Sequence, residues 1–140
     1  MEYIALIPSY QPDDSLVKLV LKCMQSFHIV VVDDGSGPKY KTFFNMIPKV
    51  CKVLTHETNK GKGTALKTGL KYIQDTYKDT EYAVVIMDHD GKYTYEEALK
   101  VIQKAEKNPD VLVLGSRNFK EANQKKSAFG NFLARTLMKL

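Results

Sequence analysis

Short apolar runs alternate along the chain with segments in which apolar residues recur every three or four positions. A run of about four to eight apolar residues is typical of a buried strand, and the wider spacing is typical of an amphipathic helix. The pattern predicts strands at residues 3–7, 28–32, 50–55, 82–87 and 111–114. It predicts helices at residues 15–27, 39–47, 64–77 and 94–107, the last beginning at a capping box formed by Thr94 and Glu97.

This alternation predicts an α/β fold with a mostly parallel sheet and helices on both faces, because continuous apolar strands must be buried on both sides. In such sheets, ligands bind beyond the carboxyl ends of the strands. Polar motifs follow four of the strands, at residues 8–10, 33–36, 88–91 and 115–117. We therefore expect these motifs to meet at one edge of the sheet and to form a binding site there.

Composition is that of an ordinary globular protein with one core. A chain of 140 residues is long enough for one domain and too short for two. Cys23 and Cys51 lie in apolar segments without metal-ligand spacing, so we expect two reduced thiols and a cytoplasmic protein. No apolar run is long enough to span a bilayer, and the run at residues 3–7 is too short for a signal peptide.

The net charge of +5 comes entirely from the C-terminal segment. Residues 117–140 hold six basic residues against one acidic residue, and the first 116 residues balance to zero. A nucleic-acid-binding domain would spread its basic residues over a face, so we expect no nucleic-acid partner. The segment also carries apolar residues at helical spacing: Phe129, Phe132, Leu133, Leu137 and Leu140. We predict a terminal helix that either packs on the domain or lies on an anionic membrane surface.

The motif Asp88-His89-Asp90 directly follows the apolar run at residues 82–87. Two carboxylates at the end of a buried strand suggest a cation site, because an unpaired buried carboxylate is costly. Oxygen ligands alone favour a hard ion, Mg²⁺ or Mn²⁺, and such ions commonly bind phosphates. The alternative is an exposed turn, since Asp and Gly are common turn residues.

Two further motifs are weaker evidence for a binding site when each is taken alone. Residues 59–64, Asn-Lys-Gly-Lys-Gly-Thr, place glycines and two lysines before a predicted helix, where backbone amides can bind an anion. The spacing is not that of a phosphate-binding P-loop. Asp33-Asp34 is by itself better explained as a turn or helix cap, and its functional interpretation is acceptance of hydrogen bonds from a base or ribose.

As an ordered set, these motifs resemble glycosyltransferase family 2. Residues 7–10, 31–36, 59–63, 88–91 and 115–117 occur in the order and at the spacing of that family, over about residues 3–117. Within the family the chain looks most like the polyprenyl-phosphate sugar transferases, which are similar to dolichyl-phosphate mannose synthase. The resemblance implies a GT-A-type, Rossmann-like fold and an inverting hexosyltransferase that uses a nucleotide-diphosphate sugar, a UDP- or GDP-sugar.

The resemblance also implies a role for each motif residue. The donor nucleotide would contact Pro8, Ser9, Tyr10, Val32, one or both of Asp33 and Asp34, Lys62 and Gly63. Asp88 and Asp90 would hold Mg²⁺ or Mn²⁺, which stabilises negative charge on the leaving diphosphate. Arg117 would be a further phosphate or acceptor contact. His89 is the variable middle residue of the motif, and we expect it to be a bystander.

The resemblance further implies a nucleotide-sugar-binding core at residues 1–117 and a basic amphipathic tail at residues 118–140. The acceptor-binding elements of the family would begin in this tail, and the chain would be truncated there. A polyprenyl phosphate acceptor is already ionised and needs little help from a general base. Such an acceptor would place the protein at the inner face of the membrane, in cell envelope biosynthesis. The alternative function is a non-catalytic nucleotide-sugar-binding module or an inactive fragment. A sugar-1-phosphate nucleotidyltransferase is disfavoured, because residues 8–12 lack the Gly-rich, Arg-containing loop of that class.

Overall fold

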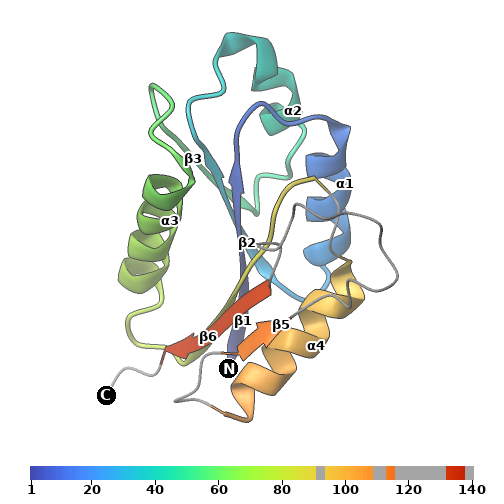
Figure 1. The fold of residues 1–140 in the computed structure, drawn as a ribbon, viewed down its shortest axis with the longest axis vertical. Coiled ribbons are helices and arrows are strands. Elements are labelled where there is room, and N and C mark those ends of the chain that lie inside the picture. The colour runs from blue at the N-terminus through green and yellow to red at the C-terminus, as the bar shows by residue number, and fades with distance from the viewer. Residues whose placement is uncertain (91–93, 109–112, 116–131, 138–140) are drawn as a thin grey trace, which may run out of the picture.

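The structure of the protein is a computed structural model that describes residues 1–90, 94–108, 113–115 and 132–137, with the backbone alone described in the last two ranges (Figure 1). Its elements are β1 (Glu2–Ser9), α1 (Asp14–Cys23), β2 (His28–Asp33), the 3₁₀ helix η1 (Pro38–Tyr40), α2 (Lys41–Asn45), β3 (Lys52–Thr55), α3 (Lys62–Thr76), β4 (Tyr82–Ile86), α4 (Tyr95–Glu106), β5 (Val113–Gly115) and β6 (Phe132–Leu137). Each strand and helix expected between residues 3 and 114 is present, with shifted ends.

Helix α1 ends earlier than the apolar spacing predicted. The helix stops at Cys23, four residues before the predicted end, and the amides of Ser26 and Phe27 turn back to the Cys23 carbonyl oxygen at 3.1 and 3.0 Å. Phe27 nevertheless packs in the core and is only 5% exposed. An apolar residue in the turn therefore continued the helical spacing beyond the helix. The predicted capping box of α4 is confirmed, because Thr94 and Glu97 bond to each other's backbone amides.

The strands form one sheet in the order β3-β2-β1-β4-β6-β5. The first four are parallel to one another, and β6 runs antiparallel to both β4 and β5. The prediction of a mostly parallel sheet is therefore confirmed. Because β1, β2, β3 and β4 run in one direction, their carboxyl ends lie at the same edge, where the polar motifs follow them.

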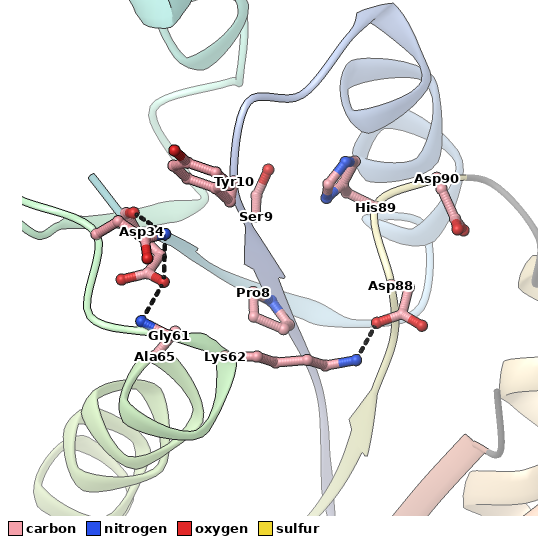
Figure 2. Close-up of a pocket in the computed structure, with 11 residues that line it drawn as sticks. Pro8, Ser9, Tyr10, Asp34, Gly61, Lys62, Ala65, Asp88, His89 and Asp90 are labelled. Atoms are coloured by element: carbon pink, nitrogen blue, oxygen red, sulfur yellow. Dashed lines mark hydrogen bonds and ion pairs between the residues drawn. The ribbon is translucent and has the colours of Figure 1, made fainter. Parts of the chain in front are cut away.

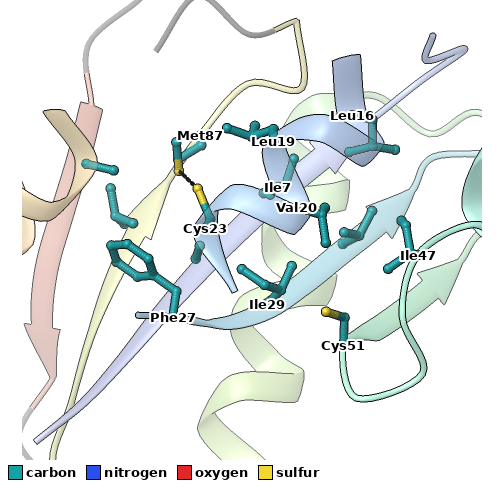
Figure 3. Close-up of a cluster of buried hydrophobic side chains, with 14 of the residues drawn as sticks. Ile7, Leu16, Leu19, Val20, Cys23, Phe27, Ile29, Ile47, Cys51 and Met87 are labelled. Atoms are coloured by element: carbon teal, nitrogen blue, oxygen red, sulfur yellow. Dashed lines mark hydrogen bonds between the residues drawn. The ribbon is translucent and has the colours of Figure 1, made fainter. Parts of the chain in front are cut away.

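Helices cover both faces of this sheet (Figure 1). One buried cluster joins α1, α2 and α4 to one face, and Figure 3 shows its side chains packed between α1 and the strands. A second cluster joins α3 to the opposite face. Neighbouring residues of β1 alternate between the clusters, with Leu6 under α3 and Ile7 under α1, and both are fully buried. Full burial contributes about 1.5–3 kcal/mol for each such side chain.

Both cysteines belong to the cluster under α1, as unpaired, buried thiols. This agrees with the sequence prediction of core residues. Burial, with a smaller contribution from Glu96, raises the pKa of the Cys23 thiol to about 11. Cys23 is therefore protonated at neutral pH and acts as a small apolar side chain beside Met87, with 4.0 Å between the sulfur atoms.

A glycine sets how closely α3 approaches the sheet. A Cβ atom at Gly69 would lie 2.2 Å from Leu6 Cδ1. The missing side chain lets the helix pack directly on β1 and β2. The close packing places the first turn of α3 beside the carboxyl ends of the strands, where the candidate site lies.

The predicted C-terminal helix is wrong over residues 132–137, which form strand β6. Leu133 pairs with Ile86 and Leu137 pairs with Tyr82. The apolar spacing fits a helix, but β4 would otherwise leave a row of backbone groups without partners, and an added strand satisfies them. Phe129 and Leu140 lie outside the described residues. The boundary after residue 117 stays a prediction, although β6 joins the same sheet as the core.

Among the described residues, no helix has the length and the apolar character that crossing a bilayer requires.

Candidate functional site

A cavity of about 380 Å³ opens at the carboxyl ends of the parallel strands (Figure 2). It is lined by Pro8, Ser9, Tyr10, Asp34, Asn59, Gly61, Lys62, Ala65, Asp88, His89 and Asp90. This volume lies within the range of small-molecule sites, about 300–1,000 Å³. The motifs that follow β1, β2 and β4 therefore meet as predicted, together with residues 59–62 before α3. The fourth motif, Ser116-Arg117, lies outside the described residues.

Three predicted site residues do not line the cavity. Val32 is fully buried in the cluster under α3, since it still belongs to β2. The Asp33 carboxylate turns away to accept a hydrogen bond from the Ser36 amide at 2.9 Å. Gly63 lies in the first turn of α3, next to Lys62, which does line the cavity.

Four lining residues were not selected from the sequence: Asn59, Gly61, Ala65 and His89. Asn59 and Gly61 belong to the loop motif whose lysine was selected, and Ala65 is the fully buried residue one turn into α3. His89 was expected to be a bystander, yet it lies at the cavity between the two aspartates (Figure 2). Its position there follows from the turn of the chain after β4.

The Asp34 carboxylate is held by four donors of the protein itself. Oδ1 accepts hydrogen bonds from His56 Nδ1 at 2.8 Å and from the Lys60 amide at 2.9 Å. Oδ2 accepts from Asn59 Nδ2 at 3.1 Å and from the Gly61 amide at 2.9 Å. A carboxylate has about four acceptor positions, so these bonds use its capacity. We call these five residues the Asp34 network. Acceptance of a bond from a base or ribose by this carboxylate stays a prediction.

Burial and hydrogen bonding act in opposite directions on Asp34, whose side chain is only 4% exposed. Burial raises the pKa of the carboxyl group, but the bonds from His56, Lys60 and Gly61 together outweigh it and lower the pKa below its usual value. Asp34 is therefore ionised at neutral pH. Its negative charge holds the loop before α3 against the end of β2.

His56 is the member of the network that sequence analysis missed. It directly follows β3 and bonds through Nδ1 to Asp34 and through Nε2 to Thr68 Oγ1, both at 2.8 Å. Because an ionised carboxylate only accepts, Nδ1 is the donor toward Asp34. His56 thus ties β2 to α3. Its position directly after a parallel strand was the signal that would have found it.

The loops at this edge also touch through backbone atoms. Gly35 has φ +69°, and a Cβ atom there would lie 2.2 Å from the Thr58 carbonyl carbon. On its other side, Ser36 Oγ accepts a hydrogen bond from the Gln11 amide at 2.8 Å. The loops after β1, β2 and β3 therefore support one another, and contacts within the protein hold this wall of the cavity in place.

An ion pair spans the opposite side of the cavity. Lys62, the first residue of α3, extends across the cavity to Asp88, with 2.5 Å between Nζ and Oδ1 (Figure 2). The side chains are 56% and 32% exposed. The Ser15 hydroxyl donates to the His89 carbonyl oxygen at 2.9 Å, which ties the segment of Asp88 and Asp90 to α1.

Asp88 and Asp90 fit a hard metal ion that arrives with a phosphate ligand. Among the residues that the structure describes, no three His, Cys, Asp or Glu side chains are grouped so as to hold a metal ion. Mg²⁺ commonly uses only one or two protein carboxylates and completes its shell with water and substrate phosphates. The Asp88 carboxylate already attracts a cation, the Lys62 ammonium group. Two carboxylates beside an open cavity are therefore a suitable donor set for Mg²⁺ or Mn²⁺.

Ser9 and Tyr10 provide polar and aromatic surface at the end of β1. Ser9 is 2% exposed, and within the described part of the chain its Oγ atom has no hydrogen-bond partner. Buried polar atoms usually have one, so a ligand group in the cavity would satisfy this hydroxyl. Tyr10 is 45% exposed and offers a ring face to a planar group.

Comparisons with known proteins agree on the fold and point to a family. The profile described as Glycosyl transferase family 2 matches residues 5–136. The UDP-N-acetylglucosamine--dolichyl-phosphate N-acetylglucosaminyltransferase of Methanococcus voltae is 31% identical over 130 residues. That match covers 80% of this chain and 50% of the relative, so the chain spans about half the length of this curated relative.

A solved structure, the crystal structure of 4-diphosphocytidyl-2C-methyl-D-erythritol synthase, superposes with a TM-score of 0.61. The superposition covers 96% of this chain and 72% of that protein, at 15% sequence identity. At this identity the likeness concerns the fold alone. It supports the α/β architecture with strands β1 to β4 in parallel.

Proposed function

Because this chain belongs to glycosyltransferase family 2, we propose that it binds a nucleoside diphosphate sugar and transfers the sugar to an acceptor. The observation that carries the proposal is the cavity in which Lys62 and Asp88 face each other beside Ser9 and Tyr10. A nucleoside diphosphate sugar has a planar base, polar ribose hydroxyls and a doubly charged diphosphate. The cavity offers these three parts an aromatic ring, a hydroxyl that has no partner among the described residues, and a cation.

The proposed binding mode assigns each of these parts of the donor to residues of the cavity. The nucleoside contacts Pro8, Ser9 and Tyr10 at the end of β1, and the diphosphate lies toward Lys62. Asp88 and Asp90 hold the Mg²⁺ or Mn²⁺ ion, which when bound supplies positive charge to the departing diphosphate. The Asp34 network keeps the loop before α3 in place, so the backbone position of Lys62 does not depend on the ligand. Arg117 as a phosphate or acceptor contact remains a proposal for a residue outside the described ranges.

We propose a UDP-sugar as the donor and a polyprenyl phosphate as the acceptor. The support is the name of the relative from Methanococcus voltae, which contains both a UDP-sugar and dolichyl phosphate. A phosphate oxygen is ionised at neutral pH and attacks the anomeric carbon without a general base. The bond from that carbon to the diphosphate breaks as the new bond forms, and the configuration is inverted. A lipid acceptor would bring the protein to a membrane surface.

A second candidate is a binding module that holds the nucleotide sugar without transferring it. In its support, the described cavity residues can all be assigned to donor binding, and the match with the relative covers 50% of its length. Both candidates share the donor site, and they differ in whether the sugar reaches an acceptor.

Nucleotide binding is tested first by thermal unfolding with UDP, GDP and CDP, each with and without Mn²⁺. We expect UDP with Mn²⁺ to raise Tm, because saturation to about 100 Kd stabilises a protein by about 2.7 kcal/mol. Asp90→Asn should abolish the metal-dependent part of this shift. An equal Tm with every nucleotide and with none would contradict the proposed donor site.

Transfer is tested with radiolabelled UDP-N-acetylglucosamine and dolichyl phosphate in detergent micelles. Label in the lipid phase supports the transferase. Metal-dependent UDP binding without labelled lipid supports the binding module. The Asp88→Asn variant serves as the background for both measurements.

A further inference from the structure

The contact between Lys62 and Asp88 has a consequence for how the metal ion binds. Lys62 Nζ lies 2.5 Å from Oδ1 of the carboxylate that we propose as a metal ligand. Binding of a divalent ion at Asp88 would bring two cations onto one carboxylate, and like charges at such distances repel. This repulsion favours opening of the ion pair when the metal binds.

We propose that Lys62 is a stand-in cation, which neutralises Asp88 before the metal ion binds and moves to the diphosphate when the metal ion arrives. This inference rests on the proposed function. It predicts that metal and nucleotide bind together. Metal alone must displace Lys62 and leave its charge uncompensated, whereas metal with a diphosphate brings the anion that Lys62 then pairs with.

The backbone around Lys62 allows the side chain to move while its base stays fixed. The preceding residue, Gly61, donates its amide to Asp34 Oδ2 at 2.9 Å and has φ +93°. The Lys62 side chain itself is 56% exposed and has four flexible carbon–carbon bonds. Exchange between two anions at the same cavity thus requires rotation of one side chain and no rearrangement of α3.

Asp88 is the suitable partner for this exchange, and Asp34, the buried carboxylate at the cavity, is not. Asp34 is held by His56, Asn59 and two backbone amides. Its charge is thus compensated without Lys62. Asp88, in contrast, has a long, exposed lysine as its ion-pair partner. A lysine is a mobile point charge that can pair with a carboxylate or with a phosphate.

The test measures Mn²⁺ binding to the whole chain by the electron paramagnetic resonance signal of free Mn²⁺, with and without UDP. In Lys62→Met, the ammonium group is lost and the chain length is kept. We expect Mn²⁺ alone to bind about fivefold more tightly or better, in the range of ordinary coupling between ligands. UDP in the presence of Mn²⁺ should bind at least about fivefold more weakly, because the diphosphate loses its lysine.

Two variants control the result. Lys67→Met removes the same charge from an exposed position of the same helix, and neither affinity should change. Lys62→Arg keeps a positive charge, and its affinity for Mn²⁺ alone should stay near that of the wild type. Circular dichroism of each variant checks that α3 is intact.

Lys62→Met should strengthen the binding of Mn²⁺ alone and weaken the binding of UDP with Mn²⁺. These opposite signs separate the alternatives. If Lys62→Met weakens UDP binding but leaves the affinity for Mn²⁺ alone unchanged, Lys62 is only a phosphate contact and the stand-in role is overturned. The same holds if both affinities fall. Failure of the wild type to bind UDP with Mn²⁺ would instead contradict the proposed function. The affinity for Mn²⁺ alone can still be measured in that case.

Discussion

Two aspartates that follow parallel strands on either side of β1 are held in contrasting ways. Asp34, after β2, is buried and accepts hydrogen bonds from one histidine, one asparagine and two backbone amides. Asp88, after β4, is partly exposed and contacts the end of a long lysine. The first arrangement cannot change without disrupting a loop, and the second can change by one side-chain rotation. The same residue type at the same edge thus serves structure in one place and ligand exchange in the other.

The largest effect is expected from Asp34→Asn, which keeps the volume but puts an amide group among four donors. Loss of one partner of a buried, hydrogen-bonded charge costs about 3–5 kcal/mol of unfolding free energy. Urea denaturation measures the loss. Asp75→Asn is the matched control, since it breaks an exposed pair with Lys71 in α3 and should cost about 0.5 kcal/mol or less. Equal stability of the two variants would contradict the structural role of Asp34.

The cost of Asp34→Asn should also depend on pH. The pKa of Asp34 is lower in the folded protein than its ordinary value of 3.8. A lowered pKa stabilises the fold above the unfolded-state pKa, and this stabilisation is lost as the pH falls through the folded-state pKa. The difference between wild type and variant should therefore be the same at about pH 7 and pH 5 and smaller near pH 3. A difference that grows toward pH 3 would be inconsistent with this sign.

The next largest effect is expected from Gly35→Ala, in the loop that carries Asp34. The new Cβ atom would lie 2.2 Å from the Thr58 backbone, at a φ of +69°. We expect a loss of about 3 kcal/mol, from backbone strain and steric overlap together. Gly37→Ala separates the two causes, because Gly37 also has positive φ, +90°, but no atom within 4 Å of the added group. Its cost should be smaller, about 2 kcal/mol, and only Gly35→Ala should disturb nucleotide binding.

Asp88→Asn should have a small effect on stability and a large effect on nucleotide binding. Its ion pair is partly exposed, so the loss of unfolding free energy should be about 0.5–1 kcal/mol. The Tm increase with UDP and Mn²⁺ should disappear. A stability loss as large as that of Asp34→Asn would remove the contrast between the two aspartates.

The smallest effect on stability is expected from Ser9→Ala. The Ser9 hydroxyl has no partner among the described residues, so its removal should leave the unfolding free energy unchanged or raise it by up to about 0.5 kcal/mol. UDP should bind about fivefold more weakly if the hydroxyl bonds to the ligand. Tyr82→Phe removes a buried hydroxyl in the cluster under α3 that likewise has no partner in the part of the chain that the structure describes. It should leave UDP binding unchanged.

Much of the fold and part of the site could be predicted from local sequence. The apolar run at residues 82–87 and the cap at Thr94 act over a few residues, and the structure has a strand and a helix there. Pro8, Tyr10, Lys62 and Asp88, which line the cavity, were expected there because their motifs follow strands or precede a helix. His56 was missed because it belongs to none of these motifs, and only its position directly after β3 marks it.

The sequence by itself determined the succession of strands and helices, the parallel sheet and the edge at which ligand-binding residues gather, because periodicity and caps depend on neighbours along the chain. Tertiary structure alone decided that residues 132–137 pair with β4 as a strand rather than continuing as a helix. It also decided which aspartate is enclosed by donors and which faces a movable lysine. These outcomes depend on contacts between residues far apart in the chain, where the choice of partner is made by packing and by unsatisfied backbone groups.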